Sequence, residues 1–111
     1  MKVLIFTFLI FFSTSIFCQP NHNPWTEILK TQVSPKGKVD YNAMSKNPEA
    51  LQRYILSLQN DTPKNTWSKN ERLSYWINAY NALTIDLILR HYPLQSIKDI
   101  KKPWDQNLWK F

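Results

Sequence analysis

Apolar residues recur at helical spacing over one long stretch, from Ser68 to Tyr92. Ser68 and Glu71 have the spacing of a capping box, and Tyr92 precedes Pro93, which disfavours helical backbone at that point. We therefore predict a helix over residues 68–92. Its wide apolar face comprises Leu73, Trp76, Ile77, Tyr80, Thr84, Leu87 and Ile88.

The opposite side of this predicted helix is also apolar, because Ala82, Ile85 and Leu89 lie there. A helix that is apolar on nearly all sides is expected to be buried at the centre of a domain. One polar stripe, formed by Arg72, Asp86 and Arg90, is expected to make its solvent-facing edge. Asp86 and Arg90 are spaced to pair along the helix.

Two shorter amphipathic helices are predicted before the central one. Asn23-Pro24 and Asn47-Pro48 each supply a cap followed by a first-turn proline. Apolar residues then follow at three- and four-residue spacing. These patterns predict helices over about 25–33 and 48–59.

The segments between these helices carry turn signals. Ser34-Pro35-Lys36-Gly37 has proline and glycine where a turn places them, and Lys38-Val39-Asp40-Tyr41 is expected to be extended, as a short strand or a strapped loop. Ser96 and Asp99 suggest a further capped turn. A chain of 111 residues holds one domain at most. We expect an α+β fold that is mainly α in the part present.

The N-terminus has the pattern of a secretory signal peptide. Met1-Lys2 is followed by an apolar run over residues 3–12 and then by small polar residues. The run is too short for a spanning helix, which needs roughly 20 apolar residues. We therefore expect residues 1–18 to be a signal peptide and the protein to be exported, either periplasmic or secreted.

Cleavage is expected between Cys18 and Gln19, which leaves residues 19–24 as a polar leader. The alternative is a lipoprotein in which Cys18 is retained and acylated, although the preceding Phe17 is larger than such sites favour. After cleavage at this position no cysteine remains, which excludes disulfides and thiolate chemistry within these residues.

The formal net charge is +6, but the basic residues are scattered, as on a solvated surface. Nucleic-acid binding needs a basic patch with stacking aromatic residues, and only Lys98, Lys101 and Lys102 come close together. We expect no nucleic-acid partner. Association with an anionic cell envelope is the minor alternative, and the partners are otherwise unknown.

Few residues offer chemistry. A single glycine excludes a phosphate-binding loop, and His22 and His91 lie far apart with no carboxylate at ligand spacing beside His22. Neither a serine–histidine–acid set nor a paired carboxylate stands out. We therefore assign no catalytic, cofactor-binding or metal-binding residue and expect no cofactor.

Two groups of polar residues remain as candidates for a pocket or for a structural role. Ser74, Asn78 and Asn81 share one edge of the predicted central helix, where buried amides would need hydrogen-bond partners. They either tie a neighbouring loop to the helix or orient a ligand. Asp40 either caps a local turn or faces the same pocket as the asparagines.

The chain resembles the domain of unknown function family 547 (DUF547) from about Trp25 to Phe111. The stretches that carry the resemblance are Gly37-x-Val39-Asp40-Tyr41, Tyr75-Trp76-Ile77-Asn78-Ala79-Tyr80-Asn81-Ala82-Leu83-Thr84-Ile85, Tyr92-Pro93 and Ser96-Ile97. Domains of this family continue into a second half with an Asp-Pro-Arg-x-His stretch and a Cys-Pro stretch, and neither occurs here.

The resemblance implies that residues 25–111 are the N-terminal part of a truncated domain. The crowding of Trp104, Leu108, Trp109 and Phe111 at the end of the chain agrees with this expectation. Whether the protein is an enzyme is left open. One hypothesis is an exported hydrolase-like domain without its catalytic half, and the alternative is a non-catalytic binding or structural module of the cell envelope.

Overall fold

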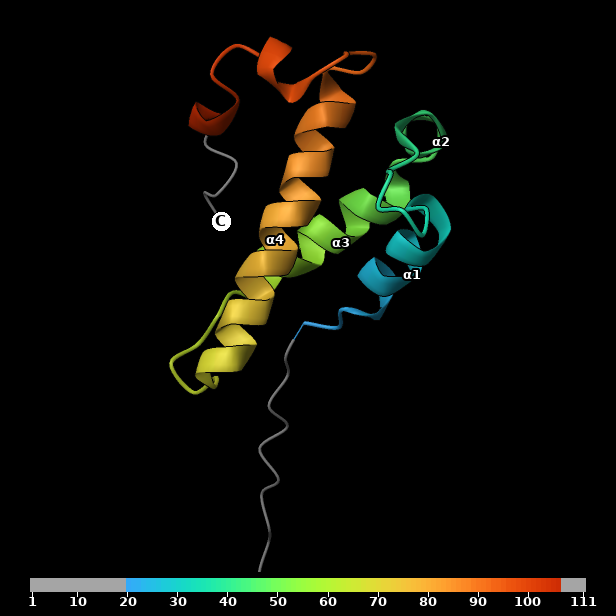
Figure 1. Ribbon diagram of the computed structural model, residues 1–111. Helices are drawn as coiled ribbons and strands as arrows, with labels where there is room; N and C mark the ends of the chain where they lie inside the picture. Colours follow the sequence, from blue (N-terminus) through green and yellow to red (C-terminus); the bar gives the residue numbers. More distant parts are fainter. Residues whose placement is uncertain (1–19, 107–111) are drawn as a thin grey trace, which may run out of the picture.

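The computed structural model describes residues 20–106, which are mainly helical. Figure 1 shows how the elements are arranged. They are, in order, α1 (Asn23–Gln32), α2 (Tyr41–Lys46), α3 (Glu49–Asn60), α4 (Lys69–Arg90), η1 (Ile97–Asp99) and η2 (Pro103–Asp105), the last two being 3-10 helices.

The mainly α prediction is confirmed, whereas the α+β label is not supported by residues 20–106. Within these residues the only β pairing is an isolated antiparallel bridge between Val33 and Val39. Too few residues of the extended segment precede α2 for a strand to form. The predicted signal peptide and the residues Leu108, Trp109 and Phe111 lie outside the described part of the chain.

The predicted central helix is present as α4. Its start is confirmed, because Ser68 Oγ accepts a hydrogen bond from the Glu71 backbone N–H at 3.1 Å and Glu71 Oε2 accepts one from the Ser68 N–H at 2.6 Å. The helix ends at Arg90, two residues before the predicted end at Tyr92. His91 is the C-cap, and its backbone N–H donates to the Ile88 carbonyl at 3.1 Å.

One side of α4 packs against α3. Tyr75, Ala79 and Ala82 are fully buried on that side, and the two alanines allow close approach of the helices. The Tyr75 hydroxyl donates to the Leu58 carbonyl at 2.6 Å, in the last turn of α3. Burial raises the pKa of Tyr75 to about 12, with a smaller contribution from the Asp61 charge, so this hydroxyl remains a donor at neutral pH.

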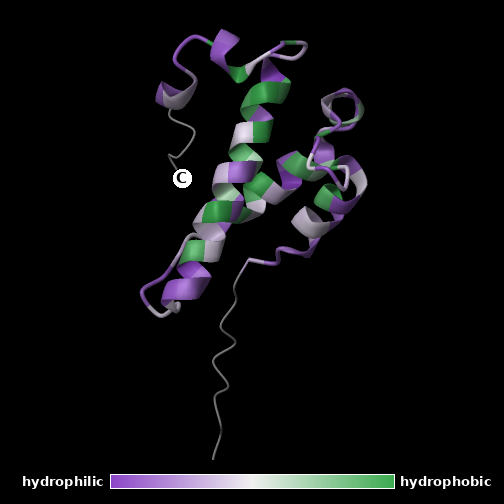
Figure 2. Ribbon diagram, in the orientation of Figure 1, coloured by the Kyte–Doolittle hydropathy of each residue, from purple (hydrophilic) through white to green (hydrophobic). Residues whose placement is uncertain are grey.

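The opposite side of α4 is exposed, so the burial expected on nearly all sides is not found within residues 20–106. The exposed fractions are 55% for Leu73, 44% for Trp76, 51% for Ile77 and 47% for Tyr80. Figure 2 shows that hydrophobic residues recur along α4. The apolar pattern therefore could not indicate which side meets the other helices.

The predicted solvent-facing edge of α4 is also wrong at Asp86, which is 1% exposed. Its Oδ1 accepts a hydrogen bond from Gln52 Nε2 of α3 at 2.5 Å, and its other oxygen pairs with Arg90. The predicted Asp86–Arg90 pair is thus confirmed. Because both partners compensate the carboxylate, Asp86 can lie buried between α3 and α4.

Aromatic rings join α1 to α3. Trp25 stacks on Tyr54 with centroids 5.4 Å apart, and His22 Nδ1 lies 2.7 Å from the Tyr54 hydroxyl. Helix α1 begins at Asn23, so the predicted cap is wrong: His22 is the N-cap and makes no side-chain cap bond. The Asn21 side chain accepts from the Asn23 N–H instead, at 3.0 Å.

The predicted turn at 34–37 is confirmed, since the Gly37 N–H donates to the Ser34 carbonyl at 2.8 Å and Gly37 has φ 77°. Helix α2 was not predicted. Asn47 is its C-cap rather than the N-cap of α3, which Pro48 occupies. A helix of six residues with one buried apolar side chain, Met44, is too short to show a helical period.

After α4 the chain turns back along the side of α4 that lies away from α1 and α2 (Figure 1). The predicted capped turn is confirmed as η1, where Ser96 and Asp99 form a capping box. Trp104 of η2 stacks on Tyr80 of α4, with centroids 6.1 Å apart and planes 14° from parallel. In residues 20–106, no helix has both the length and the apolar content that a membrane crossing requires.

Candidate functional site

The exposed side of α4 is the first candidate site, because it brings large apolar residues together with three polar residues singled out from the sequence. We define the α4 face by its members Leu73, Ser74, Trp76, Ile77, Asn78, Tyr80 and Asn81. At about 100° per residue, these positions share an arc of roughly 200° on the helix. All are exposed except Asn78, which is half-buried.

The polar members of the α4 face are not used to hold the fold together. Ser74, Asn78 and Asn81 make no side-chain hydrogen bond within the described chain, so nothing there supports the alternative that they tie a loop to the helix. Their hydroxyl and amide groups remain available to an incoming group. Each amide offers both donors and an acceptor.

Aromatic contacts connect the α4 face to its surroundings. Trp76 lies edge-on to the buried ring of Tyr75, with centroids 5.0 Å apart. At the other end of the face, the stacked ring of Trp104 is 53% exposed and extends the aromatic surface of Tyr80. The α4 face is therefore positioned by the same helix that forms the core.

Basic residues flank the α4 face. Lys69 and Arg72 are exposed in the first turn of α4, and Lys101 and Lys102 are exposed next to Trp104 in sequence. None of these four forms an ion pair within residues 20–106. The nearby carboxylate of Glu71 is held in the capping box. The exposed Asp105 directly follows Trp104, so the four basic residues leave an excess of positive charge around the α4 face rather than a purely positive surface.

The structure does not bring Asp40 to the α4 face. Asp40 is exposed, and its Oδ1 accepts a hydrogen bond from the Ala43 N–H at 2.9 Å, which makes it the N-cap of α2. The next residue, Tyr41, contacts the ring of Tyr92 just beyond α4, with centroids 6.5 Å apart. Nine residues separate Asn81 from the end of α4, or about 13 Å along the axis.

A small pocket of about 270 Å³ lies where α2 meets the end of α4. Tyr41, Tyr92, Ser96 and Ile97 line it, together with Ile88, Leu94 and Gln95. The first four come from three of the stretches that carry the family resemblance. Burial raises the pKa of Tyr41 at its edge. The sequence analysis did not predict this pocket, because it predicted neither α2 nor the packing of α2 against the end of α4.

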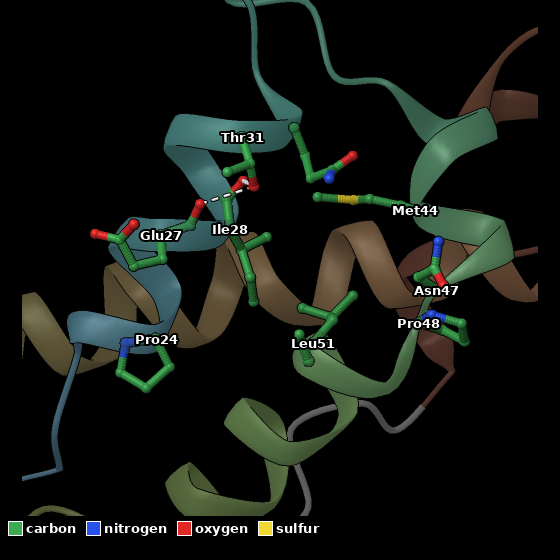
Figure 3. A pocket seen from close by; sticks show the side chains of 10 residues that line it. Pro24, Glu27, Ile28, Thr31, Met44, Asn47, Pro48 and Leu51 are labelled. Atoms are coloured by element: carbon green, nitrogen blue, oxygen red, sulfur yellow. Dashed lines mark hydrogen bonds between the residues drawn. The ribbon is translucent and has the colours of Figure 1, made fainter.

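A larger pocket of about 370 Å³ lies among α1, α2 and α3 (Figure 3). None of the four candidate residues from the sequence lines either pocket. Within residues 20–106, no three histidine, cysteine or acidic side chains come together as metal ligands would.

Residues 64–110 match a family model described as "Protein of unknown function, DUF547". We refer to residues 64–110 as the DUF547 segment because they match this model. The resemblance seen in the sequence is confirmed over this range, which contains the whole α4 face and Trp104. The Gly37–Tyr41 stretch lies outside it and remains a resemblance. No match was found among curated proteins or among solved structures.

Proposed function

We propose that this protein is an exported, non-catalytic binding module whose α4 face docks an acidic, apolar-faced protein segment. The observation that carries the proposal is the exposure of Leu73, Trp76, Ile77 and Tyr80, each between 44% and 55%, on one side of a helix in the DUF547 segment. Contiguous exposed apolar surface is typical of interaction sites.

The composition of the α4 face suits a protein partner. Tryptophan and tyrosine are enriched at protein interfaces because they combine a large apolar area with a polar group. Asn78 and Asn81 can hydrogen-bond to the backbone or side chains of an extended or helical partner. Docking there would cover apolar area without rearranging the core, since Tyr75 and Ala79 already pack on α3.

Charge supports an acidic partner. Lys69 and Arg72 stand at one end of the α4 face, and Lys101 and Lys102 follow at the other. Complementary charges speed association and select among partners. The interaction should therefore weaken as salt is raised, because exposed charges are screened.

Export is part of the proposal and is supported by the signal-peptide pattern over residues 1–18. The alternative is an exported hydrolase-like domain without its catalytic half, for which residues 20–106 would supply the scaffold. Both histidines have structural contacts: His22 Nδ1 meets the Tyr54 hydroxyl at 2.7 Å and His91 Nδ1 meets the Leu87 carbonyl at 3.0 Å. Within the described residues, neither histidine makes a hydrogen bond to a serine.

The test uses two labelled helical peptides of about 14 residues with leucine and phenylalanine at i, i+3, i+4 and i+7. In one peptide the remaining positions are mainly glutamate, and in the other they are mainly lysine. Binding is followed by fluorescence polarisation at about 0.05 M and 0.5 M salt. We expect the acidic peptide to bind more tightly, with a lower affinity at the higher salt.

Leu73→Glu is expected to weaken binding of the acidic peptide by about tenfold or more, because it replaces exposed apolar surface with a charge of the same sign as the peptide. Leu56→Glu on α3 is the matched control, because Leu56 is also 55% exposed. Helical circular dichroism should be unchanged in both variants. Equal loss in both, or equal binding of the acidic and basic peptides, would contradict the proposal.

A further inference from the structure

We infer that the pocket among α1, α2 and α3 is a binding site for a small uncharged molecule with an apolar body and one hydrogen-bond donor. This site is separate from the α4 face, since none of its lining residues belongs to α4. It also lies outside the DUF547 segment.

The floor of the pocket is apolar. Ile28 of α1, Met44 of α2 and Leu51 of α3 are all buried, and their side chains point toward one another in Figure 3. Pro24 and Pro48 stand on opposite sides of the opening, and Ala50 adds a small side chain at the rim. The volume of about 370 Å³ lies within the range of small-molecule sites.

Two of the polar side chains in the wall already have partners. Thr31 Oγ1 donates to the Glu27 carbonyl at 2.8 Å. The Glu27 carboxylate pairs with Lys30 at 3.1 Å. Glu27 is the one charged residue in the lining, and its carboxylate is exposed to solvent. The buried part of the lining carries no charge, which favours an uncharged ligand.

Gln32 contributes to the pocket wall a side-chain oxygen that has no hydrogen-bond donor as a partner. Its Oε1 is buried and accepts no hydrogen bond in the described chain, although its backbone carbonyl accepts from the Asp40 N–H at 2.8 Å. Buried acceptors in folded proteins are nearly always paired, so an unpaired amide oxygen in a pocket wall calls for a donor. Because Oε1 is closed to solvent in the unliganded protein, a ligand N–H or O–H reaches it after the half-buried Gln32 side chain rotates toward the pocket.

The probe is indole, whose ring is apolar and carries one N–H, and the matched probe is indene, which has nearly the same shape without the donor. Binding is measured from amide NMR shifts of the protein on titration with each compound. We expect saturable shifts at Thr31, Gln32, Met44 and Ala50. Indole should bind about three- to tenfold more tightly than indene, the difference that one net hydrogen bond provides.

Two variants separate the pocket from the amide. Ala50→Phe should block both probes, and it leaves the core intact because Ala50 is exposed. Gln32→Met should keep binding but remove the preference for indole. Gln59→Met, at an exposed glutamine of α3 outside the pocket, is the control and should retain the preference.

Each contrary outcome has a definite meaning. Absence of saturable shifts, or binding that survives Ala50→Phe, would show that the pocket is not a ligand site. Equal affinity for indole and indene in the unmodified protein, or a preference that persists in Gln32→Met, would overturn the role of Gln32. None of these results depends on the acidic-peptide experiment at the α4 face.

Discussion

The side of α4 that packs on α3 contains two alanines, whereas the apolar residues of the opposite α4 face are all large. Ala79 and Ala82 are fully buried on the packed side, whereas Leu73, Trp76 and Ile77 are exposed on the other. Hydrophobic residues are found on both sides (Figure 2). Hydrophobicity alone therefore does not explain which side is buried.

Close packing between α3 and α4 explains better why one side of α4 is buried. Helices approach closely where side chains at the contact are small, and Ala79 and Ala82 provide such a contact. Tyr75 adds a hydroxyl that reaches the Leu58 carbonyl at the end of α3. The two sides of α4 can be compared directly by making the same substitution on each.

The largest contrast is expected between two leucines of α4. Leu83→Ala removes a side chain that is 3% exposed and should destabilise the fold by about 2–5 kcal/mol, from lost burial and the remaining cavity. Leu73→Ala removes a leucine that is 55% exposed and should change stability by at most about 0.5 kcal/mol. Urea unfolding followed by circular dichroism measures both. Similar losses would show that the α4 face is buried in solution.

The next contrast concerns the buried carboxylate. Asp86→Ala leaves Gln52 and Arg90 without their shared partner and should cost about 1–3 kcal/mol. Lys64→Ala, which removes the exposed Asp61–Lys64 pair, should cost at most about 0.5 kcal/mol. Urea midpoints at pH 7 give both values. If Asp86→Ala were neutral, the contacts of Asp86 with Gln52 and Arg90 would not contribute to stability.

Two tyrosines on opposite sides of α4 give a smaller contrast. Tyr75→Phe removes the donor to the Leu58 carbonyl, leaving an acceptor at the end of α3 unpaired, and should cost about 1–2 kcal/mol. Tyr80→Phe keeps the ring that stacks on Trp104 and should cost less than Tyr75→Phe, because the Tyr80 side chain is 47% exposed. Thermal unfolding of both variants distinguishes them. An equal loss would assign no special role to the Tyr75 hydroxyl.

Local signals in the sequence were sufficient for several helix ends. The capping box at Ser68 and Glu71 and the capped turn at Ser96 and Asp99 depend on residues close together in the chain, and both are confirmed. Helix α2 was missed because a six-residue segment gives no helical period. The burial of Asp86 was missed because its partner Gln52 lies 34 residues away.

The candidate site was predictable only in part. The spacing of Ser74, Asn78 and Asn81 correctly placed them on one side of α4, but not beside Asp40, which caps α2. Their exposure depended on which side α3 covers, and the two apolar sides of α4 are alike in sequence. Both pockets are formed by residues from separate helices or loops, and no periodicity within one segment reports such an approach.

The smallest expected effect on stability is also the sharpest test of the α4 face. Asn78 and Asn81 make no side-chain hydrogen bond in the described chain, and alanine is the better helix former. The double variant Asn78→Ala, Asn81→Ala should therefore unfold at the same temperature or slightly higher, with a gain of at most about 1 kcal/mol. Its binding of the acidic peptide should fall, because the amides offer hydrogen bonds that alanine cannot replace. A large drop in melting temperature would instead assign these amides a structural role, and unchanged binding would limit the docking surface to its apolar residues.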